Sequence, residues 1–233
     1  MLATPSTPAT VSGDPRSSTS RPAAMPETLR TETEAGVRSI VLSRPEAYNT
    51  ITPALRDELA TAIDEADADS GVRVILLRAD GPAFCAGYGL DWSTSAQADE
   101  GRGERVWDSV SDLRMISAFV DTYLKLWYAA KPTVAAVQGW CIGGGTDLVL
   151  CADMVVAGEG ASFGYPPARV WGTPTTAMWV YRLGLERAKR YLLTGDEIPA
   201  PEAARIGLIL DHEHKAWPRG DGSLWHVISG ATG

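Results

Sequence analysis

Hydrophobic positions along most of this chain alternate between strand-like and helix-like spacing. Short apolar runs rich in β-branched residues at Val37–Leu42, Val72–Leu77 and Thr133–Val137 indicate buried strands. After Thr52, which is expected to cap a helix starting at Pro53, and again over 104–127, apolar residues recur every three to four positions, which predicts two helices. Alternating strands and helices predict a layered α/β domain.

The second half of the chain continues this alternation with shorter elements. We expect a glycine-rich turn at 139–145, a helix over 146–151, a strand over 153–157, helical structure around Gly184 within 175–193, a short helix over 201–206 and a strand beginning at 208–210. Residues 161–168 are expected to be irregular, because Pro166 and Pro167 oppose a helix there.

The two ends differ in character from the middle. Residues 1–28 are rich in Ser, Thr, Pro and Ala without hydrophobic periodicity, which predicts a disordered tail, and Met25 is an alternative start. Clear patterning begins at Gly36, and one domain is expected over 29–210. Residues 211–233 hold lone tryptophans and all three histidines without a sustained period, so an irregular tail is expected there.

Composition limits the kinds of molecule that this chain is expected to bind. The chain has 233 residues, is 45% hydrophobic and carries a formal net charge of −8, with no basic run. This argues against nucleic acid or an anionic membrane as a partner. No apolar run is long enough to span a membrane. Three unpaired cysteines without metal-ligand spacing predict a reducing, cytoplasmic location and no metal site.

The stretch over 131–157 carries the strongest signal for chemistry. It joins a buried strand to a helix through Gly143, Gly144 and Gly145, and Asp147 follows in the first helical turn. The first N–H groups of a helix have no partner inside it and favour negative charge. A second glycine-rich loop, 79–91, also follows a strand directly. The sequence thus predicts backbone N–H groups suited to binding an anion, together with the carboxylate of Asp147.

Neither loop has the glycine spacing of a dinucleotide fingerprint or of a phosphate-binding loop. Residues 160–164 do match the G-x-S-x-G pattern of a serine hydrolase, with Ser162 as nucleophile. That pattern requires a helix immediately afterwards, and Tyr165-Pro166-Pro167 follows instead. A serine hydrolase using Ser162 stays an alternative function.

Several motifs in order, from about Val37 to Leu210, resemble the crotonase (enoyl-CoA hydratase/isomerase) superfamily. They are Arg44-Pro45-Glu46-Ala47-Tyr48-Asn49, Ala83-Phe84-Cys85-Ala86-Gly87, Lys131-Pro132 through Gly139, Gly143-Gly144-Gly145 with an acid two residues on, Cys151-Ala152-Asp153, Ser162-Phe163-Gly164 and Leu193-Thr194-Gly195-Asp196. The resemblance implies an α/β spiral of ββα units with surrounding helices. Family members continue past this chain's last motif with helices that close the site and build trimers, so it implies a truncated C-terminal helical part.

The resemblance also implies chemistry on acyl-CoA thioesters. A thioester enolate would be held by two backbone N–H groups, those of Tyr88 and Gly144, in an oxyanion hole. Coenzyme A would be part of the substrate, with no separate cofactor, and a homo-oligomer, trimer or hexamer, is expected. Substrate contacts are expected from Glu46, Ala47, Ala86, Gly87, Gly89, Leu90 and Asp91.

The acid–base residues depart from the family pattern. Family hydratases use two glutamates; the first position is Asp147 here, and the second falls on Pro167, which cannot transfer a proton. Hydration across a double bond needs both a base and an acid. A single-carboxylate reaction is therefore more natural: isomerisation, hydrolysis of a thioester or C–C bond, or decarboxylation. A non-catalytic acyl-CoA-binding homologue is the other alternative, and Asp147 could simply stabilise the helix dipole.

Overall fold

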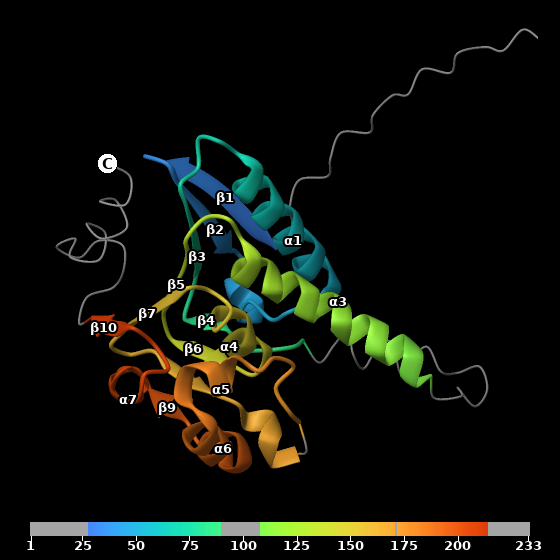
Figure 1. Ribbon diagram of the computed structural model, residues 1–233, viewed down its shortest axis with the longest axis vertical. Coiled ribbons are helices and arrows are strands. Elements are labelled where there is room, and N and C mark those ends of the chain that lie inside the picture. Colours follow the sequence, from blue (N-terminus) through green and yellow to red (C-terminus); the bar gives the residue numbers. More distant parts are fainter. Residues whose placement is uncertain (1–27, 90–107, 171, 214–233) are drawn as a thin grey trace, which may run out of the picture.

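The larger of two β-sheets organises the fold (Figure 1). The computed structural model describes residues 28–89, 108–170 and 172–213. The larger sheet has the order β1-β2-β3-β5-β7-β10, in which β1 is antiparallel to β2 and the other pairs are parallel. Its strands are β1 (Leu29–Glu34), β2 (Val37–Leu42), β3 (Val74–Ala79), β5 (Thr133–Val137), β7 (Met154–Gly158) and β10 (Asp211–Glu213).

The second sheet is smaller and has the order β4-β6-β8-β9. Its strands are β4 (Ala83–Cys85), β6 (Trp140–Ile142), β8 (Ser162–Gly164) and β9 (Ile198–Pro199). Each of the successive pairs β3–β4, β5–β6 and β7–β8 gives its first strand to the larger sheet and its second to the smaller one. With the helices between them, these pairs form the predicted spiral of ββα units.

Hydrophobic side chains fill both faces of the larger sheet. The main core includes Ile40, Leu42, Ile75 and Leu77. Alternate residues of the same strands point the other way, into a smaller cluster made by Val37, Val74, Leu76, Val134, Ala136 and Val156. Burial on both faces explains why these strands read as continuous apolar runs in the sequence.

Two long helices lie side by side against this sheet (Figure 1): α1 (Pro53–Ala68) and α3 (Ser109–Tyr128). As predicted, Thr52 caps α1, and its hydroxyl accepts a hydrogen bond from the Leu55 N–H at 3.2 Å. Helix α3 packs through Phe119, Tyr123 and Leu126. None of the described helices combines the length and apolar character that crossing a membrane requires.

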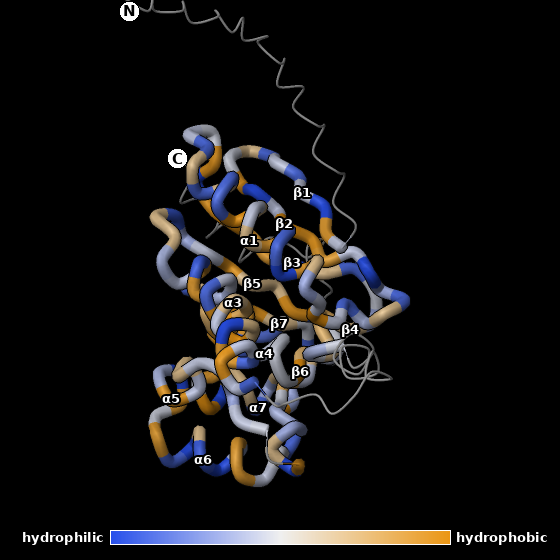
Figure 2. Tube along the Cα trace, turned by 90° about the vertical axis from the view of Figure 1, so that its right-hand side faces the viewer, coloured by the Kyte–Doolittle hydropathy of each residue, from blue (hydrophilic) through white to orange (hydrophobic). Residues whose placement is uncertain are grey.

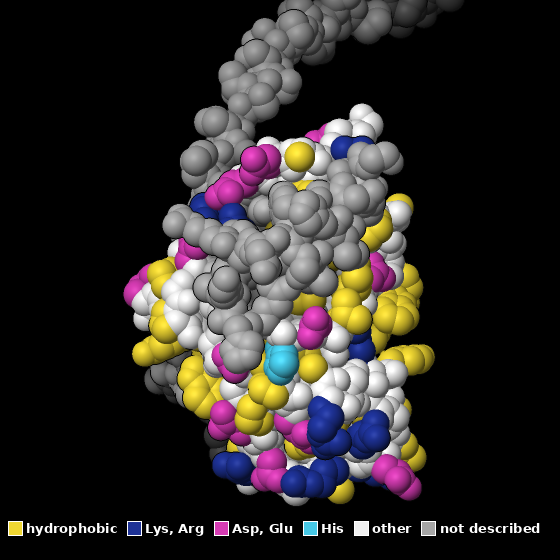
Figure 3. All heavy atoms as spheres, turned by 90° about the vertical axis from the view of Figure 1, so that its left-hand side faces the viewer, with side chains coloured by type: hydrophobic (Ala, Val, Ile, Leu, Met, Phe, Trp, Pro, Cys, Tyr) yellow, Lys and Arg dark blue, Asp and Glu magenta, His cyan; other side chains and the backbone are white. Residues whose placement is uncertain are grey.

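The remaining helices surround the smaller sheet and the site. They are the 3-10 helices η1 (Pro45–Ala47) and η2 (Pro166–Val170), and the α-helices α4 (Gly144–Val149), α5 (Met178–Leu183), α6 (Leu185–Thr194) and α7 (Ala200–Ile206). Figure 3 shows basic side chains gathered at the end of the molecule occupied by α6. Some form surface ion pairs, such as Arg190 with Asp196 at 2.6 Å.

Several predicted elements differ from the structure. Strand β1 was not predicted because only Leu29 in it is buried and its other residues are polar (Figure 2). A strand, β6, occupies part of the turn predicted at 139–145. Pro166 and Pro167 begin a 3-10 helix in the segment expected to be irregular, since proline is compatible with a first helical turn.

Two further differences lie at the ends of elements. The last strand lies at 211–213, not at 208–210, so the segment expected to be an irregular tail begins with a strand paired to β7. In α3, Val110 and Leu113 belong to the apolar periodicity that predicted the helix, but they are 53% and 67% exposed. Figure 1 shows the reason: the N-terminal part of α3 extends beyond the sheet that it packs on.

Candidate active site

Two loops that are far apart in sequence are joined by backbone hydrogen bonds at the edge of the fold. The Ala86 N–H donates to the Tyr48 carbonyl at 3.0 Å, and the Ile51 N–H donates to the Gly87 carbonyl at 2.8 Å. The Gly89 N–H donates back to Ile51 at 3.0 Å. These bonds bring the predicted substrate-contact positions near η1 next to those that follow β4.

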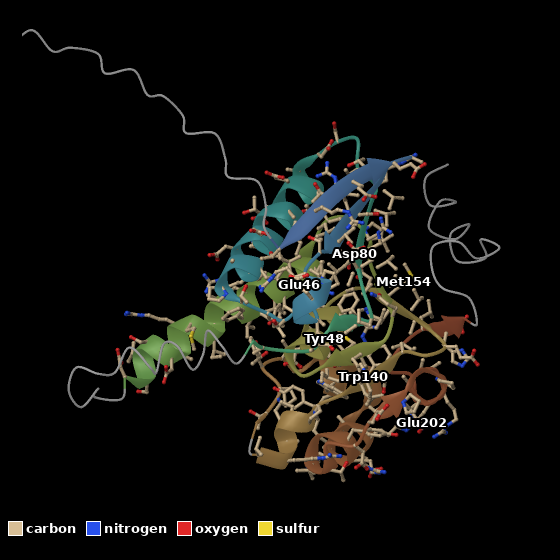
Figure 4. All side chains as sticks on the ribbon, turned by 180° about the vertical axis from the view of Figure 1, so that it is seen from behind. Glu46, Tyr48, Asp80, Trp140, Met154 and Glu202 are labelled. Carbon is tan, nitrogen blue, oxygen red and sulfur yellow. The ribbon has the colours of Figure 1, made fainter. Side chains whose placement is uncertain are left out.

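The predicted contact residues have different environments within this pair of loops. Glu46 is exposed on η1 (Figure 4), Ala47 and Ala86 are half-buried, and Gly87 and Gly89 are buried. Two other predicted contacts, Leu90 and Asp91, lie outside the described residues.

Asn49 holds the first loop in place and was not singled out from the sequence. Its side chain is 1% exposed and its φ is 51°, in the left-handed region that asparagine tolerates better than most residues. Its Oδ1 accepts from the Arg44 N–H at 2.8 Å, and its Nδ2 donates to the carbonyls of Asp80 and Ala83 at 2.9 and 3.0 Å. The only sign of this role in the sequence is a single asparagine at the end of a turn that contains proline.

The two predicted oxyanion donors belong to backbone segments that face each other. Because Ile51 pairs with the Gly87 carbonyl and the Gly89 N–H, the Tyr88 N–H points away from Ile51. Gly144 is the first residue of α4, so its N–H has no acceptor inside the helix. Neither N–H donates to a backbone carbonyl of the described residues. A Cβ on Gly87 would lie 3.7 Å from the Gly144 nitrogen, which places the segments in close apposition.

Glycine at position 145 allows α4 to begin at this place. A Cβ there would lie 2.8 Å from both the Cβ and the carbonyl oxygen of Cys85, closer than real side chains approach. The helix N-terminus can therefore rest directly on β4, beside the Gly87–Tyr88 segment. Its positive dipole end then faces the same space as the two N–H groups.

Asp147 is a fully buried carboxylate with three hydrogen-bond donors. The Thr175 N–H and hydroxyl donate to its Oδ2 at 2.9 and 3.0 Å, and Trp179 Nε1 donates to its Oδ1 at 3.1 Å. Burial raises the pKa of Asp147 to about 6, and the hydrogen bonds from Thr175 and Trp179 oppose that rise. Asp147 can therefore change protonation state near neutral pH.

The side chain of Tyr88 lies against the backbone of Gly144. Its ring packs edge-to-face on Phe119 at 5.3 Å. A Cβ on Gly144 would lie 2.7 Å from its Cε2, so the ring covers the Gly144 backbone. Its hydroxyl accepts from the Tyr123 hydroxyl at 3.1 Å. Burial raises the pKa of Tyr88 above its usual value.

Pro167 also borders this region, through its Cγ, which lies 3.8 Å from the position of a Cβ on Gly143. The residue predicted to stand at the family's second acid position therefore borders the predicted site without a titratable side chain. Tyr165 donates to the Thr173 carbonyl at 2.7 Å and packs against Trp179.

The environment of Ser162 does not match a hydrolase nucleophile. Ser162 lies within β8, and its hydroxyl donates to Glu197 Oε1 at 2.6 Å. The helix required after a nucleophile elbow is replaced by the turn into η2. The histidine that the structure describes, His212, lies in β10 of the other sheet.

Sequence reasoning missed three side chains of the candidate site: Thr175 and Trp179, which bind Asp147, and Tyr123, which is bonded to Tyr88. The first two are 28 and 32 residues from Asp147 in sequence. Tyr123 reads as an ordinary core position of α3. Only the fold brings the three together, although a Thr-rich helix start at 173–176 was a weak signal for a polar role.

Comparisons with known proteins give a consistent result. A family model described as enoyl-CoA hydratase/isomerase matches residues 32–213. A probable enoyl-CoA hydratase of Rhizobium meliloti (strain 1021) is 33% identical over 192 residues, covering 78% of this chain and 67% of the relative. A protein described as enoyl-CoA hydratase from Thermus thermophilus is 35% identical over 175 residues, covering 74% of this chain and 66% of its own length. This chain spans about two thirds of both.

Solved structures show the same likeness in three dimensions. The crystal structure of an enoyl-CoA hydratase from Mycobacterium smegmatis superposes with a TM-score of 0.78 at 37% identity, covering 88% of this chain and 72% of the other.

Proposed function

Because the chain belongs to the enoyl-CoA hydratase/isomerase family of the crotonase superfamily, we propose that it acts on acyl-CoA thioesters through a thioester enolate. The Tyr88 and Gly144 N–H groups bind the thioester oxygen, and the loops at 46–47 and 86–89 contact the substrate. Coenzyme A enters as part of that substrate, and no other cofactor takes part.

One observation supports this proposal most directly. Two backbone segments, Gly87–Tyr88 and Gly143–Gly144, face each other with N–H groups that donate to no backbone carbonyl of the described chain. Negative charge develops on the thioester oxygen as the enolate forms. Preorganised donors at that position contribute about 3 kcal/mol each to the transition state.

The reaction that suits this site is a proton shift, such as double-bond isomerisation, more than two-carboxylate hydration. Asp147 lies in the first turn of α4, the helix that begins at Gly144, and Pro167 supplies no second acid. In isomerisation, a single group removes a proton from one carbon and returns it to another. One carboxylate with a pKa near neutrality can serve both steps.

A first test separates binding from turnover. Calorimetry measures the affinity for a saturated and an α,β-unsaturated acyl-CoA, and enoyl absorbance follows conversion by wild type and Asp147→Asn. We expect both proteins to bind and only wild type to convert. Equal turnover by the two proteins would remove Asp147 from the mechanism, and failure of wild type to bind any thioester would refute the proposal.

A non-catalytic acyl-CoA-binding protein is the second candidate. Pro167 and the complete burial of Asp147 favour it, since neither presents an acid–base group on the surface. Binding without conversion by wild type would support this candidate. A homo-oligomeric assembly and a cytoplasmic location remain proposals that accompany either function.

A further inference from the structure

The carboxylate of Asp147 is held by donors that all come from one short segment of the chain. The backbone N–H and the hydroxyl of Thr175 donate to Oδ2 at 2.9 and 3.0 Å. The indole N–H of Trp179 donates to Oδ1 at 3.1 Å. Thr175 precedes α5, and Trp179 is the second residue of that helix. The start of α5 therefore binds both oxygens of a carboxylate that belongs to α4.

These hydrogen bonds are divided unequally between the two oxygens. A carboxylate has about four lone-pair positions, two on each oxygen. Oδ2 accepts two hydrogen bonds, which fill its positions, whereas Oδ1 accepts one. Within residues 28–89, 108–170 and 172–213, no other donor reaches the carboxylate. The second position on Oδ1 is therefore the place where Asp147 can form a bond to a proton.

The indole of Trp179 is itself fixed by its surroundings. Its side chain is 1% exposed, and its ring packs edge-to-face against Tyr165 with the ring centroids 6.4 Å apart. The Tyr165 hydroxyl in turn donates to the Thr173 carbonyl at 2.7 Å. A side chain whose rotamer is locked by packing can hold a reacting group in one orientation. Trp179 can therefore set the direction in which Oδ1 points.

We propose that Thr175 and Trp179 are positioning residues, which orient Asp147 so that Oδ1 is the atom that exchanges a proton with the bound thioester. This inference rests on the proposed function and adds the reacting atom to it. In the forward step, the C–H bond next to the thioester breaks, an O–H bond forms at Oδ1, and the electron pair becomes the enolate. The reverse step returns the proton to carbon, so no oxidant or co-reactant is needed.

The same hydrogen bonds make the proposal measurable through the protonation of Asp147. A donor to an ionised carboxylate stabilises the charged form, so the loss of one donor raises the pKa of the carboxyl. The other titratable groups that interact with Asp147 have pKa values raised by burial, so they stay uncharged near neutral pH: Tyr88, Tyr123, Tyr165, Cys141 and Cys151. A shifted titration therefore reports the altered donor.

The pH dependence of turnover tests the two positioning residues. Conversion of an α,β-unsaturated acyl-CoA is measured from pH 5 to 8.5 for wild type, Trp179→Phe and Thr175→Val. Each variant loses one hydrogen bond to a charged group, so the inflection should rise by about one pH unit. Above the inflection Asp147 is ionised in every variant, and a remaining loss reports its orientation. There kcat of Trp179→Phe should be about 10–100-fold below wild type with KM unchanged.

The hydroxyl at position 175 affects Oδ2 rather than Oδ1. Thr175→Val keeps the backbone N–H bond to Oδ2 and the Trp179 bond to Oδ1. Above its inflection, kcat of Thr175→Val should therefore stay within about 10-fold of wild type. Thr175→Ser restores the hydroxyl and should restore the wild-type inflection. A loss in Thr175→Val as large as that in Trp179→Phe would overturn the assignment of Oδ1.

Two controls separate positioning from a general loss of packing. Tyr165→Phe removes a hydroxyl that lies beside Trp179 and is bonded to the Thr173 carbonyl, so the inflection should stay at the wild-type pH. Carbon-13 NMR of protein labelled at its aspartate carboxyl groups follows Asp147 without turnover, through the signal that Asp147→Asn lacks. Melting temperatures show whether each variant is folded.

The outcomes distinguish this inference from the proposed function. Raised inflections in Trp179→Phe and Thr175→Val, with the larger loss of kcat in Trp179→Phe, support the inference. The wild-type inflection and kcat in both variants, with lost turnover in Asp147→Asn, overturn it and leave the proposed function standing. If Trp179→Phe does not fold, equal carbon-13 titrations of Thr175→Val and Thr175→Ser overturn it. A wild type that binds acyl-CoA but converts none overturns the enolate mechanism and the inference together.

Discussion

Asp147 is a carboxylate whose protonation differs between the folded and the unfolded chain. Its pKa rises from 3.8 to about 6 on folding, because burial penalises the charged form. Between these two values the folded protein holds a proton that the unfolded chain has lost. The contribution of Asp147 to stability is therefore greatest below pH 4 and declines as pH rises through about 6.

This shift predicts a pH-dependent difference between wild type and Asp147→Asn. From pH 4 to pH 7, the free energy of unfolding of wild type should fall relative to the variant by about 2 kcal/mol, since asparagine does not titrate. Urea unfolding of both proteins across this range measures the difference. A constant difference at all pH values would show that the carboxylate does not titrate abnormally.

The same shift predicts the pH profile of activity. If ionised Asp147 accepts the substrate proton, turnover should rise with pH through about 6 and then level off. The neighbouring Cys85 does not interfere, because burial raises its pKa to about 12. Initial rates with an acyl-CoA between pH 5 and 8 provide the measurement, and a flat profile would exclude Asp147 as the base.

Gly145 gives a second prediction at the residue scale. Gly145→Ala forces a methyl group against the Cβ and carbonyl of Cys85, so we expect a loss of about 1–3 kcal/mol in stability and a displaced start of α4. Gly160→Ala is the control, since a Cβ there meets nothing within 4 Å. Thermal unfolding of both variants makes the comparison, and equal melting temperatures would contradict close packing at 145.

At the scale of elements, the η1 loop depends on Asn49. Asn49→Ala leaves the carbonyls of Asp80 and Ala83 without this donor and removes the acceptor of the Arg44 N–H. We expect a destabilisation of about 2–4 kcal/mol and weaker binding of coenzyme A thioesters, since the loop also anchors Ala86. Chemical denaturation measures the stability and calorimetry measures the affinity. An unchanged affinity would show that this loop does not contribute to substrate binding.

Elements were predictable from the sequence where one pattern dominated the local structure. The fully buried β5 and the capped α1 match their predicted positions closely. Strand β1 lacks such a pattern because it is an edge strand with one buried residue. The N-terminal part of α3 keeps the apolar periodicity of the helix, but its Val110 and Leu113 are exposed, so periodicity predicts the helix without predicting which part of it is buried.

At the scale of the molecule, α3 and α5 leave a groove with exposed aromatic side chains. The groove encloses about 290 Å³, and Tyr128 and Tyr181 on its walls are 75% and 73% exposed. Aromatic surface of this kind is typical of protein interfaces. We therefore expect the predicted homo-oligomer to use this groove.

Light scattering coupled to size exclusion tests this expectation. Wild type should give a mass that is a multiple of 24.9 kDa, and Tyr181→Glu should lower it. Leu193→Glu, on α6, is a control at a residue that is 78% exposed outside the groove. A monomeric wild type would contradict the prediction.

The sequence predicts only part of the candidate site. Local motifs predicted Tyr88, Gly144 and Asp147 from two separate loops, and the fold brings these loops together, because glycine spacing determines how the backbone turns. The partners of Asp147 could not be predicted, since Thr175 and Trp179 reach it only through the packing of α5 on α4. Backbone geometry is encoded locally, whereas the environment of a buried charge depends on the complete fold.

The facing N–H groups of Tyr88 and Gly144 have a consequence for how such a protein can evolve. A donor in the main chain survives nearly every point mutation, because only proline removes the N–H. If these N–H groups bind the thioester oxygen as proposed, the side chains around them, including those at 88 and 167, can change without removing the donors. New reactions would then arise by exchange of the side chains that transfer protons, while the backbone donors stay the same.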